Sequence, residues 1–266
     1  MGEITGPLSN MWPLGMPPLE ENLILTNPYL AFLLRSEGED ILVDNGVHER
    51  FLIDGKAWGG LPATLGGRFV VDSLAKEGTK PENIKTVVYT HLHNDHAGNC
   101  AMFPAATHIF QKDEWANLLD PLPAQLLRRD YDLGVIPELK VLKTLKVEGD
   151  FELRDGITLY KTPGHTLGSM SVAVNTKKGI VVYIGDLSHF YYTVFPQHGE
   201  IVDMKGVRHP IPKAPDIFGP ALPTSLVYDY YAFYNSIYKV KAIATRNEPG
   251  FILPGHEPSL VLPGAI

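Results

Sequence analysis

Four side chains that can bind a metal ion lie within six positions of one another. They are His91, His93, Asp95 and His96. Neutral imidazole and carboxylate are ligands that zinc and similar divalent ions take in proteins. On an extended backbone, residues two apart point the same way. We therefore expect His91 and His93 to face one ion, and Asp95 and His96, which follow a bend, to face a second.

Further candidate ligands stand alone, each just after an apolar run typical of a strand. His165 follows Pro163-Gly164, Asp186 follows Ile184-Gly185, and His256 follows Pro254-Gly255. Any one of them in isolation is best interpreted as a turn residue. Together with the first cluster they make seven ligands, enough for two ions with a shared carboxylate and room for water.

The elements around these residues indicate a mixed α/β fold. Strands are predicted at 29–34 and 41–44, joined by a polar turn, and again at 85–89 and 107–110. The apolar spacing predicts helices at 69–77, 112–119 and 123–129. From residue 151 to 184 the pattern is a run of hairpins. The first 20 residues, rich in proline, are expected to be irregular, and residues 47–67 to form a long loop. Two sheets packed face to face with helices outside would accommodate these elements.

Asp44 ends the second of these strands, before Asn45-Gly46. Two interpretations are open for Asp44. It is either a turn residue or a hydrogen-bond acceptor for the ring nitrogen of a ligand histidine that does not bind the metal.

The order His91-x-His93-x-Asp95-His96, then His165, Asp186 and His256, resembles the metallo-β-lactamase superfamily of binuclear hydrolases. The resemblance covers essentially the whole chain. It implies that His91, His93 and His165 bind one metal ion, that Asp95, His96 and His256 bind the second, and that Asp186 bridges both. It also implies the α+β, four-layer αβ/βα sandwich, and it places a strand-end aspartate where Asp44 stands.

Two differences from other branches of the superfamily narrow the choice of branch. The true β-lactamases of this superfamily have a cysteine where Asp186 stands, and the flavodiiron proteins have a glutamate where His93 stands. The N-acyl-homoserine lactonase-like branch is the most similar group. There a tyrosine follows the bridging aspartate by three positions, whereas this chain has His189 at that place. His189 can also donate a hydrogen bond or move a proton, and Tyr191 and Tyr192 are nearby alternatives.

The expected reaction is the opening of a lactone or ester by attack of a metal-bridging hydroxide on the carbonyl carbon. The substrate would be small and apolar, such as an N-acyl homoserine lactone. Asp95 would pass a proton to the leaving alkoxide, and His189 or Tyr191 would assist the carbonyl oxygen. Alternatives are amide, thioester or organophosphate hydrolysis at the same site or, in a different class, a mononuclear iron dioxygenase. Zinc is the first expectation for the two ions, and iron, manganese or cobalt would accept the same ligands.

Residues 1–266 are expected to form one domain, with a proline- and aromatic-rich insertion at about 190–245 as a candidate substrate lid. Within it, residues 195–223 are predicted to be irregular, and residues 226–243 to form a helix carrying many tyrosines. This helix is either part of the core or a wall of an apolar substrate pocket. The insertion and the helix are also candidate homodimer surfaces.

Composition excludes several classes of partner. A formal net charge of −7 without a long basic run argues against a nucleic-acid partner. No apolar stretch is long enough to span a membrane, and the N-terminus has no apolar signal-like region. The lone Cys100 excludes an intramolecular disulfide and is expected to be a buried small side chain. We therefore expect a cytoplasmic protein that acts on a small molecule.

Overall fold

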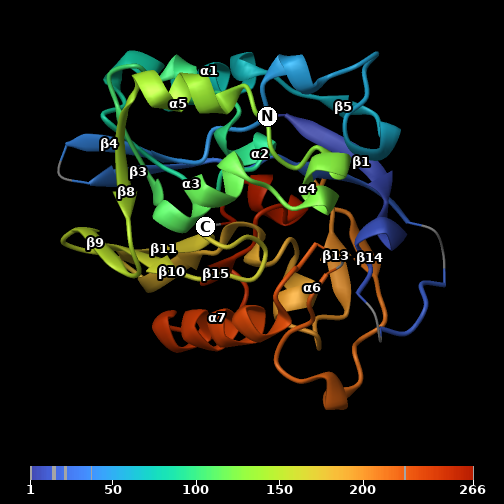
Figure 1. Ribbon diagram of the computed structural model, residues 1–266. Helices are drawn as coiled ribbons and strands as arrows, with labels where there is room; N and C mark the ends of the chain where they lie inside the picture. The colour runs from blue at the N-terminus through green and yellow to red at the C-terminus, as the bar shows by residue number, and fades with distance from the viewer. Residues whose placement is uncertain (1, 14–15, 21–22, 37, 225, 266) are drawn as a thin grey trace. The chain divides into compact units, whose positions relative to one another are not determined.

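The computed structural model describes residues 2–13, 16–20, 23–36, 38–224 and 226–265. The described residues form two compact units (Figure 1). Unit 1 is drawn from Met1–Ile4 and Tyr29–Gly149, and unit 2 from Thr5–Pro28 and Asp150–Ile266. The expectation of one domain with a lid at about 190–245 stays a prediction.

Unit 1 is built on a five-stranded sheet in the order β3-β4-β6-β7-β8. Its strands are β3 (Phe32–Ser36), β4 (Glu39–Val43), β6 (Thr86–Val88), β7 (Thr107–Gln111) and β8 (Lys143–Val147), and its helices are α1 (Gly67–Lys76), α2 (Asn94–Ala97), α3 (Lys112–Leu119), α4 (Pro123–Arg128) and α5 (Val135–Val141). The short β5 (Ala63–Thr64) pairs with Glu3 and Ile4 of β1 (Glu3–Pro7). Only β3 is antiparallel to its neighbour, so β4, β6, β7 and β8 end at one edge.

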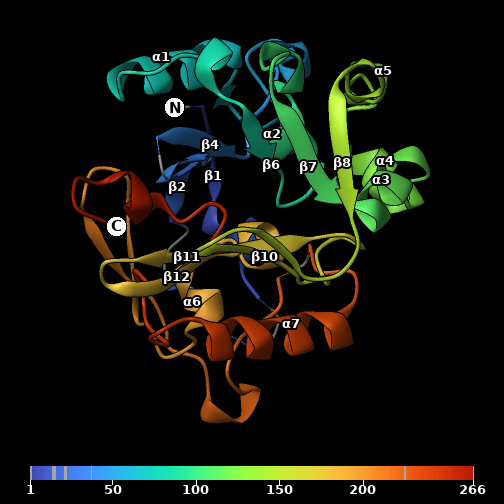
Figure 2. The ribbon, with the colours of Figure 1, turned by 90° about the vertical axis from the view of Figure 1, so that its left-hand side faces the viewer.

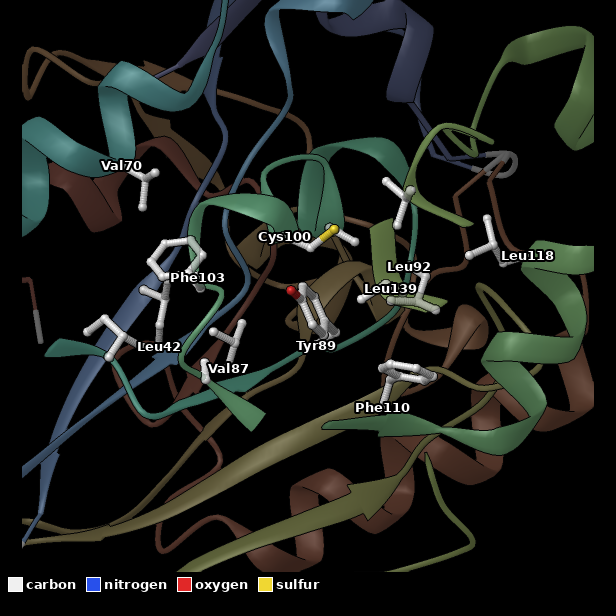
Figure 3. Close-up of a cluster of buried hydrophobic side chains, with 14 of the residues drawn as sticks. Leu42, Val70, Val87, Tyr89, Leu92, Cys100, Phe103, Phe110, Leu118 and Leu139 are labelled. Atoms are coloured by element: carbon white, nitrogen blue, oxygen red, sulfur yellow. The ribbon is translucent and has the colours of Figure 1, made fainter. Parts of the chain in front are cut away.

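Figure 3 shows the main core of unit 1, in which side chains of the sheet meet those of α1, α3 and α5. Leu42, Val87 and Phe110 come from strands, and Val70, Leu118 and Leu139 from the three helices. Cys100 is fully buried in this cluster, as expected, and its thiol donates to Glu138 Oε2 at 3.2 Å. Burial raises the pKa of Cys100, so the thiol stays protonated.

Unit 2 contains a five-stranded sheet in the order β15-β12-β11-β10-β9. Its strands are β9 (Phe151–Arg154), β10 (Ile157–Lys161), β11 (Met170–Thr176), β12 (Gly179–Tyr183) and β15 (Ile252–Leu253), with β2 (Ile24–Pro28), β13 (Glu200–Val202) and β14 (Arg208–Pro210) outside the sheet and α6 (Tyr191–Val194) and α7 (Tyr230–Ile243) as its helices. Helix α7 lies along one face of the sheet (Figures 1 and 2).

Helix α7 has two different sides. Phe233, Ile237 and Val240 are completely buried against strands β11 and β12. Tyr231 is 89% exposed and Tyr238 is 57% exposed. The core interpretation therefore holds for the buried side, and a role of the tyrosines in a substrate pocket stays a prediction.

Several elements differ from those expected. The first 20 residues are not all irregular, because β1 occupies Glu3–Pro7, where Pro7 is tolerated at the strand end. Helix α5 and the edge strand β8 were not predicted. The segment 195–223 is not wholly irregular, since β13 and β14 form a hairpin. Its turn is fixed by Asp203, whose Oδ1 accepts from the amides of Lys205 and Val207.

None of the helices in the described ranges is both long and apolar enough to cross a membrane.

His108 is expected to make the free energy of unfolding of the protein depend on pH. The Tyr89 hydroxyl donates to Nδ1 at 2.8 Å, and Nε2 donates to the Phe103 carbonyl at 3.1 Å, so the buried ring is satisfied as the neutral form. Burial lowers the pKa of His108 below its ordinary value of 6.5. As the pH falls through 6.5, the unfolded chain takes up the proton first.

The free energy of unfolding is therefore expected to fall with decreasing pH below this value, with a slope from this residue of at most about 1.4 kcal/mol per pH unit. Chemical denaturation of the wild type and of His108→Gln at pH 8 to 5 measures the contribution. The difference between the two curves should change with pH, and parallel curves would contradict the assignment.

Candidate metal centre

Unit 1 places its four predicted ligands at the edge where β4 and β6 end. The loop after β6 carries His91 and His93, and α2 carries Asp95 and His96. All four residues are buried, and the most exposed of them, Asp95, is 7% exposed. The ring centroids of His91 and His93 are 4.5 Å apart, and those of His91 and His96 are 4.0 Å apart. His91 and His93 offer ligand atoms within 4.8 Å of each other, and so do Asp95 and His96.

Asp44 forms hydrogen bonds with His96 and with Thr90, the residue just before His91. Its Oδ2 accepts from His96 Nδ1 and from the Thr90 hydroxyl, both at 2.8 Å, and its Oδ1 accepts from the Thr90 amide at 2.8 Å. The residue is completely buried and has a left-handed backbone, with φ of 58°. Of the two interpretations left open by the sequence, the structure supports the acceptor, because Asp44 accepts a hydrogen bond from His96; the role of His96 as a metal ligand stays a prediction. A carboxylate behind a ligand histidine fixes its tautomer and orientation.

Asp44→Asn is expected to weaken zinc affinity by about 10- to 100-fold, because an amide is a weaker acceptor for His96 and no longer carries the charge. Competition with a coloured chelator measures the affinity. The matched control is Asp54→Asn, since Asp54 also has a left-handed backbone, with φ of 50°, but is exposed. Equal zinc affinities in both variants would contradict the role given to Asp44.

A second carboxylate that supports the loop was not predicted from the sequence. Glu114 of α3 is completely buried, and its Oε1 accepts from the Leu92 amide at 3.0 Å and the Tyr131 hydroxyl at 2.9 Å. The Tyr131 ring in turn lies edge-on to His93, with centroids 4.6 Å apart. In the sequence, Glu114 looked like an ordinary acid in the first turn of a helix.

Unit 2 places its three predicted ligands at one edge of its sheet. Strands β10 and β12 run the same way because each is antiparallel to β11, and β15 is parallel to β12. His165, Asp186 and His256 follow the ends of these three strands and are all buried. Asp186 Oδ2 lies 3.2 Å from His256 Nε2 and 3.7 Å from His165 Nε2. The register of the sheet therefore gathers residues that are far apart in the sequence.

The hydrogen bonds of these histidines indicate which nitrogen carries the proton. His165 Nδ1 lies 2.8 Å from the Leu226 carbonyl, and His256 Nδ1 lies 2.9 Å from the Pro28 carbonyl. A carbonyl only accepts, so each Nδ1 must be the donor, and each Nε2 then carries a lone pair. In a neutral ring that lone pair faces the oxygen of Asp186, an arrangement that a cation would stabilise. The residues of unit 2 thus fit a divalent metal ion, as does His96 with Asp44 in unit 1.

Gly164 explains why a glycine precedes His165. Its φ is 146°, and a Cβ at this position would lie 2.8 Å from Cα of Phe233. A larger residue would push the turn away from α7. Glycine is therefore required at position 164 by packing as well as by backbone conformation.

The other predicted residues of unit 2 are also buried. His189 Nε2 lies 3.2 Å from Asp186 Oδ2. The Tyr191 hydroxyl accepts from the Gly250 amide at 3.1 Å, and burial raises the pKa of Tyr191. The Tyr192 hydroxyl donates to the Met11 carbonyl at 3.3 Å. Of these three, only His189 contacts a predicted ligand within unit 2.

Glu257 was not predicted from the sequence either. It is 3% exposed and lies next to His256, and its Oε2 accepts from the Tyr191 amide at 2.9 Å. Its Oε1 accepts from the Ser259 hydroxyl at 2.6 Å. Burial raises the pKa of Glu257, which these hydrogen bonds oppose. Glu257 therefore ties the turn of His256 to the start of α6.

The sequence profile of the metallo-β-lactamase superfamily matches residues 26–256. An N-acyl homoserine lactonase of Bacillus cereus is 33% identical over 174 residues, which cover 62% of this chain and 66% of the relative. The N-acyl homoserine lactonase AttM of Rhizobium radiobacter is 31% identical over 159 residues, which cover 55% of this chain and 59% of the relative. The chain thus spans less than two thirds of the length of each relative, 66% in the first case and 59% in the second.

Solved structures show the same similarity. An AiiA variant of B. thuringiensis, with N-decanoyl-L-homoserine bound at its active site, superposes with a TM-score of 0.69 at 25% identity, covering 96% of this chain and 90% of the other. AidC, described as a dizinc quorum-quenching lactonase, has a TM-score of 0.61 at 19% identity, covering 88% of this chain and 74% of the other. The second similarity concerns the fold alone.

These comparisons confirm the fold predicted from the ligand pattern. These relatives are named lactonases, which is the class of hydrolase expected from the sequence. The profile covers most of the chain, from before β3 to His256, and so includes every predicted ligand. The chain belongs to the metallo-β-lactamase superfamily.

Proposed function

We propose that this protein is a binuclear metal-dependent hydrolase that opens a lactone, with N-acyl homoserine lactones as its first candidate substrates. The observation that carries the proposal is the orientation of His165 and His256. In each ring Nδ1 donates to a backbone carbonyl, while Nε2 faces the carboxylate of Asp186. Such imidazoles are prepared to bind a metal ion. The named activity of the relatives supports the substrate class.

Seven residues are the proposed ligands. We propose that His91, His93 and His165 hold one ion, that Asp95, His96 and His256 hold the other, and that Asp186 serves both. Support comes from the ligand pairs found within each unit and from the superfamily to which the chain belongs. Zinc is the first candidate because the set mixes imidazole and carboxylate, a donor set that iron, manganese and cobalt also accept.

When bound, the two ions would polarise the lactone carbonyl and lower the pKa of the attacking water. The chain's own residues supply positioning and proton transfer. Asp95 is the proposed proton carrier to the leaving oxygen, because it is a buried carboxylate that lies beside His96, at 3.6 Å. Tyr191 is proposed to support the segment at Gly250, because its hydroxyl accepts from that amide.

The substrate class is tested by measuring hydrolysis of N-acyl homoserine lactones of increasing acyl length, alongside simple lactones, aryl esters, thioesters and organophosphates. We expect the highest kcat/KM among the lactones, loss of activity on chelation, and recovery when zinc is added back. A metal-loaded protein that hydrolyses thioesters or organophosphates but no lactone would refute the lactonase assignment and keep the hydrolase class.

A further inference from the structure

The turn that carries His165 is held by residues on helix α7 and just before it. The Gly164 carbonyl accepts from the amides of Tyr228 and Asp229, at 2.9 Å and 3.1 Å. The Leu226 carbonyl accepts from His165 Nδ1 at 2.8 Å. The imidazole and the backbone that leads into it are therefore fixed by one segment, which is distant in the sequence.

The start of α7 is itself fixed. Asp229 is the N-cap of the helix, and its Oδ1 accepts from the Ala232 amide at 2.9 Å. The Phe233 amide donates to the Asp229 carbonyl at 2.9 Å, and Phe233 is completely buried. Amides at a helix start have no carbonyl within the helix to bond, so the Asp229 amide can donate to Gly164. The segment that holds His165 is thus anchored in the core of unit 2.

Ser236 adds a contact to the same turn. It is 4% exposed and lies one helical turn after Phe233, on the buried side of α7. A serine inside a helix often bonds the carbonyl four residues before it. The Ser236 hydroxyl instead donates to the Pro163 carbonyl at 2.7 Å. The polar group on this otherwise apolar side of the helix therefore serves the turn of His165.

The contacts of Ser236 and of the helix start act on successive peptide groups. The Pro163 carbonyl belongs to the peptide group before Gly164, and the Gly164 carbonyl to the one after it. Glycine has the widest backbone freedom of all residues, and Gly164 has a φ of 146°, which other residues rarely adopt. Holding both of its peptide groups removes most of the freedom with which His165 could turn away. The hydrogen bond of Ser236 thereby helps to set the direction of the imidazole.

We propose that Ser236 is a positioning residue for His165, acting through the Pro163 carbonyl, and that α7 supports this proposed metal ligand. The inference rests on the proposed function in one respect, that His165 holds a metal ion. A ligand held in its binding direction loses less conformational freedom when the ion binds. Without the hydroxyl the turn would sample other directions, and the ion held by His165 would bind more weakly.

The experiment is a Zn²⁺ and Co²⁺ titration of the metal-free protein with three variants of Ser236. Ser236→Ala is expected to weaken one of the two metal equivalents by about tenfold, the lower end of the usual effect of removing a group that orients a ligand. Ser236→Thr and Ser236→Val have nearly the same shape as each other, but only threonine keeps the donor. The threonine variant should therefore bind this equivalent more tightly than the valine variant, again by about tenfold.

His165→Ala identifies the equivalent concerned. It should lose the ion that Ser236→Ala binds weakly, so the two variants should give the same absorption spectrum at limiting Co²⁺. Excess Co²⁺ should return Ser236→Ala to the wild-type spectrum, because all its ligands are present. His165→Ala should keep its altered spectrum at any Co²⁺ concentration.

The matched control is Thr176→Ala, because the Thr176 hydroxyl also donates to a carbonyl at 2.7 Å, that of Gly179. These two residues lie in the turn between β11 and β12, at the edge of the sheet opposite the proposed ligands. This control should bind both ions as the wild type does.

Two outcomes would overturn the inference. If the threonine and valine variants bound metal alike, the hydroxyl would have no effect on the site. If Ser236→Ala lost affinity for both ions equally and its metal-free form melted at a lower temperature, Ser236 would have a general packing role in α7. The titration needs no substrate, so a wild type that binds two ions but hydrolyses no lactone would refute the proposed function and leave the role of Ser236 untouched.

Discussion

Asp186→Ala is expected to lower kcat/KM for a lactone by about 10³-fold or more and to reduce the metal content of the purified protein. The proposed ions share this carboxylate, and a bound metal contributes several kcal/mol of transition-state stabilisation. Within unit 2, the side chain contacts His165, His189 and His256. Its removal breaks no backbone hydrogen bond of the sheet, so the metal-free variant should unfold at a denaturant concentration close to that of the metal-free wild type.

Asp155→Ala is the control for this substitution, because Asp155 lies exposed in the turn between β9 and β10. It should keep both metal content and activity. Elemental analysis and initial rates measure the two quantities, and circular dichroism checks the fold. Full activity in Asp186→Ala would exclude the shared carboxylate from the mechanism.

Gly255→Ala is expected to impair the centre without removing any ligand. A Cβ at this position would lie 2.1 Å from Asp186 Oδ1 and 2.9 Å from the carbonyl oxygen of Gly185. Real Cβ atoms do not approach so closely, so the carboxylate or the main chain must move. Overpacking of this kind typically costs about 1–3 kcal/mol of stability. Because the Asp186 oxygen that gives way first belongs to a proposed metal ligand, zinc affinity is expected to fall at least about tenfold.

The matched control for this glycine is Gly199→Ala. There a Cβ would meet Lys213 Cε at 2.9 Å, the far end of a flexible side chain that can move aside. Thermal unfolding and chelator competition, applied to both variants, separate the effect of an added methyl group from the effect of its place. If the two variants bound zinc equally well, the close approach of Gly255 to Asp186 would not matter for the site.

The positions of His165, Asp186 and His256 could be predicted from the sequence because each one follows a strand. The three strands that precede His165, Asp186 and His256 are short, apolar and bounded by glycine or proline, and their shared edge follows from sheet register. Helix α3 was predicted at the bounds that the structure shows, since its apolar residues recur with helical spacing. Local patterns of this kind need no knowledge of distant contacts.

The parts that could not be predicted depend on distant partners. Strand β8 has a mixed, largely exposed pattern, and only its pairing with β7 makes it a strand. Helix α5 is interrupted in sequence by Pro137, which is tolerated in its first turn. Pro28 and Leu226 act through backbone carbonyls, which leave no mark in the residue types. Glu114 resembles any other acid near the start of a helix until its buried partners are known.

The most direct test of the proposed binuclear hydrolase is the metal content per chain of the freshly purified protein, measured by elemental analysis alongside lactone turnover. We expect two ions per chain, zinc first, with turnover that is lost on chelation and restored when metal is returned. A single iron per chain with no hydrolysis of any lactone, ester or thioester would contradict it. In that case the seven residues would serve a different chemistry from the one proposed.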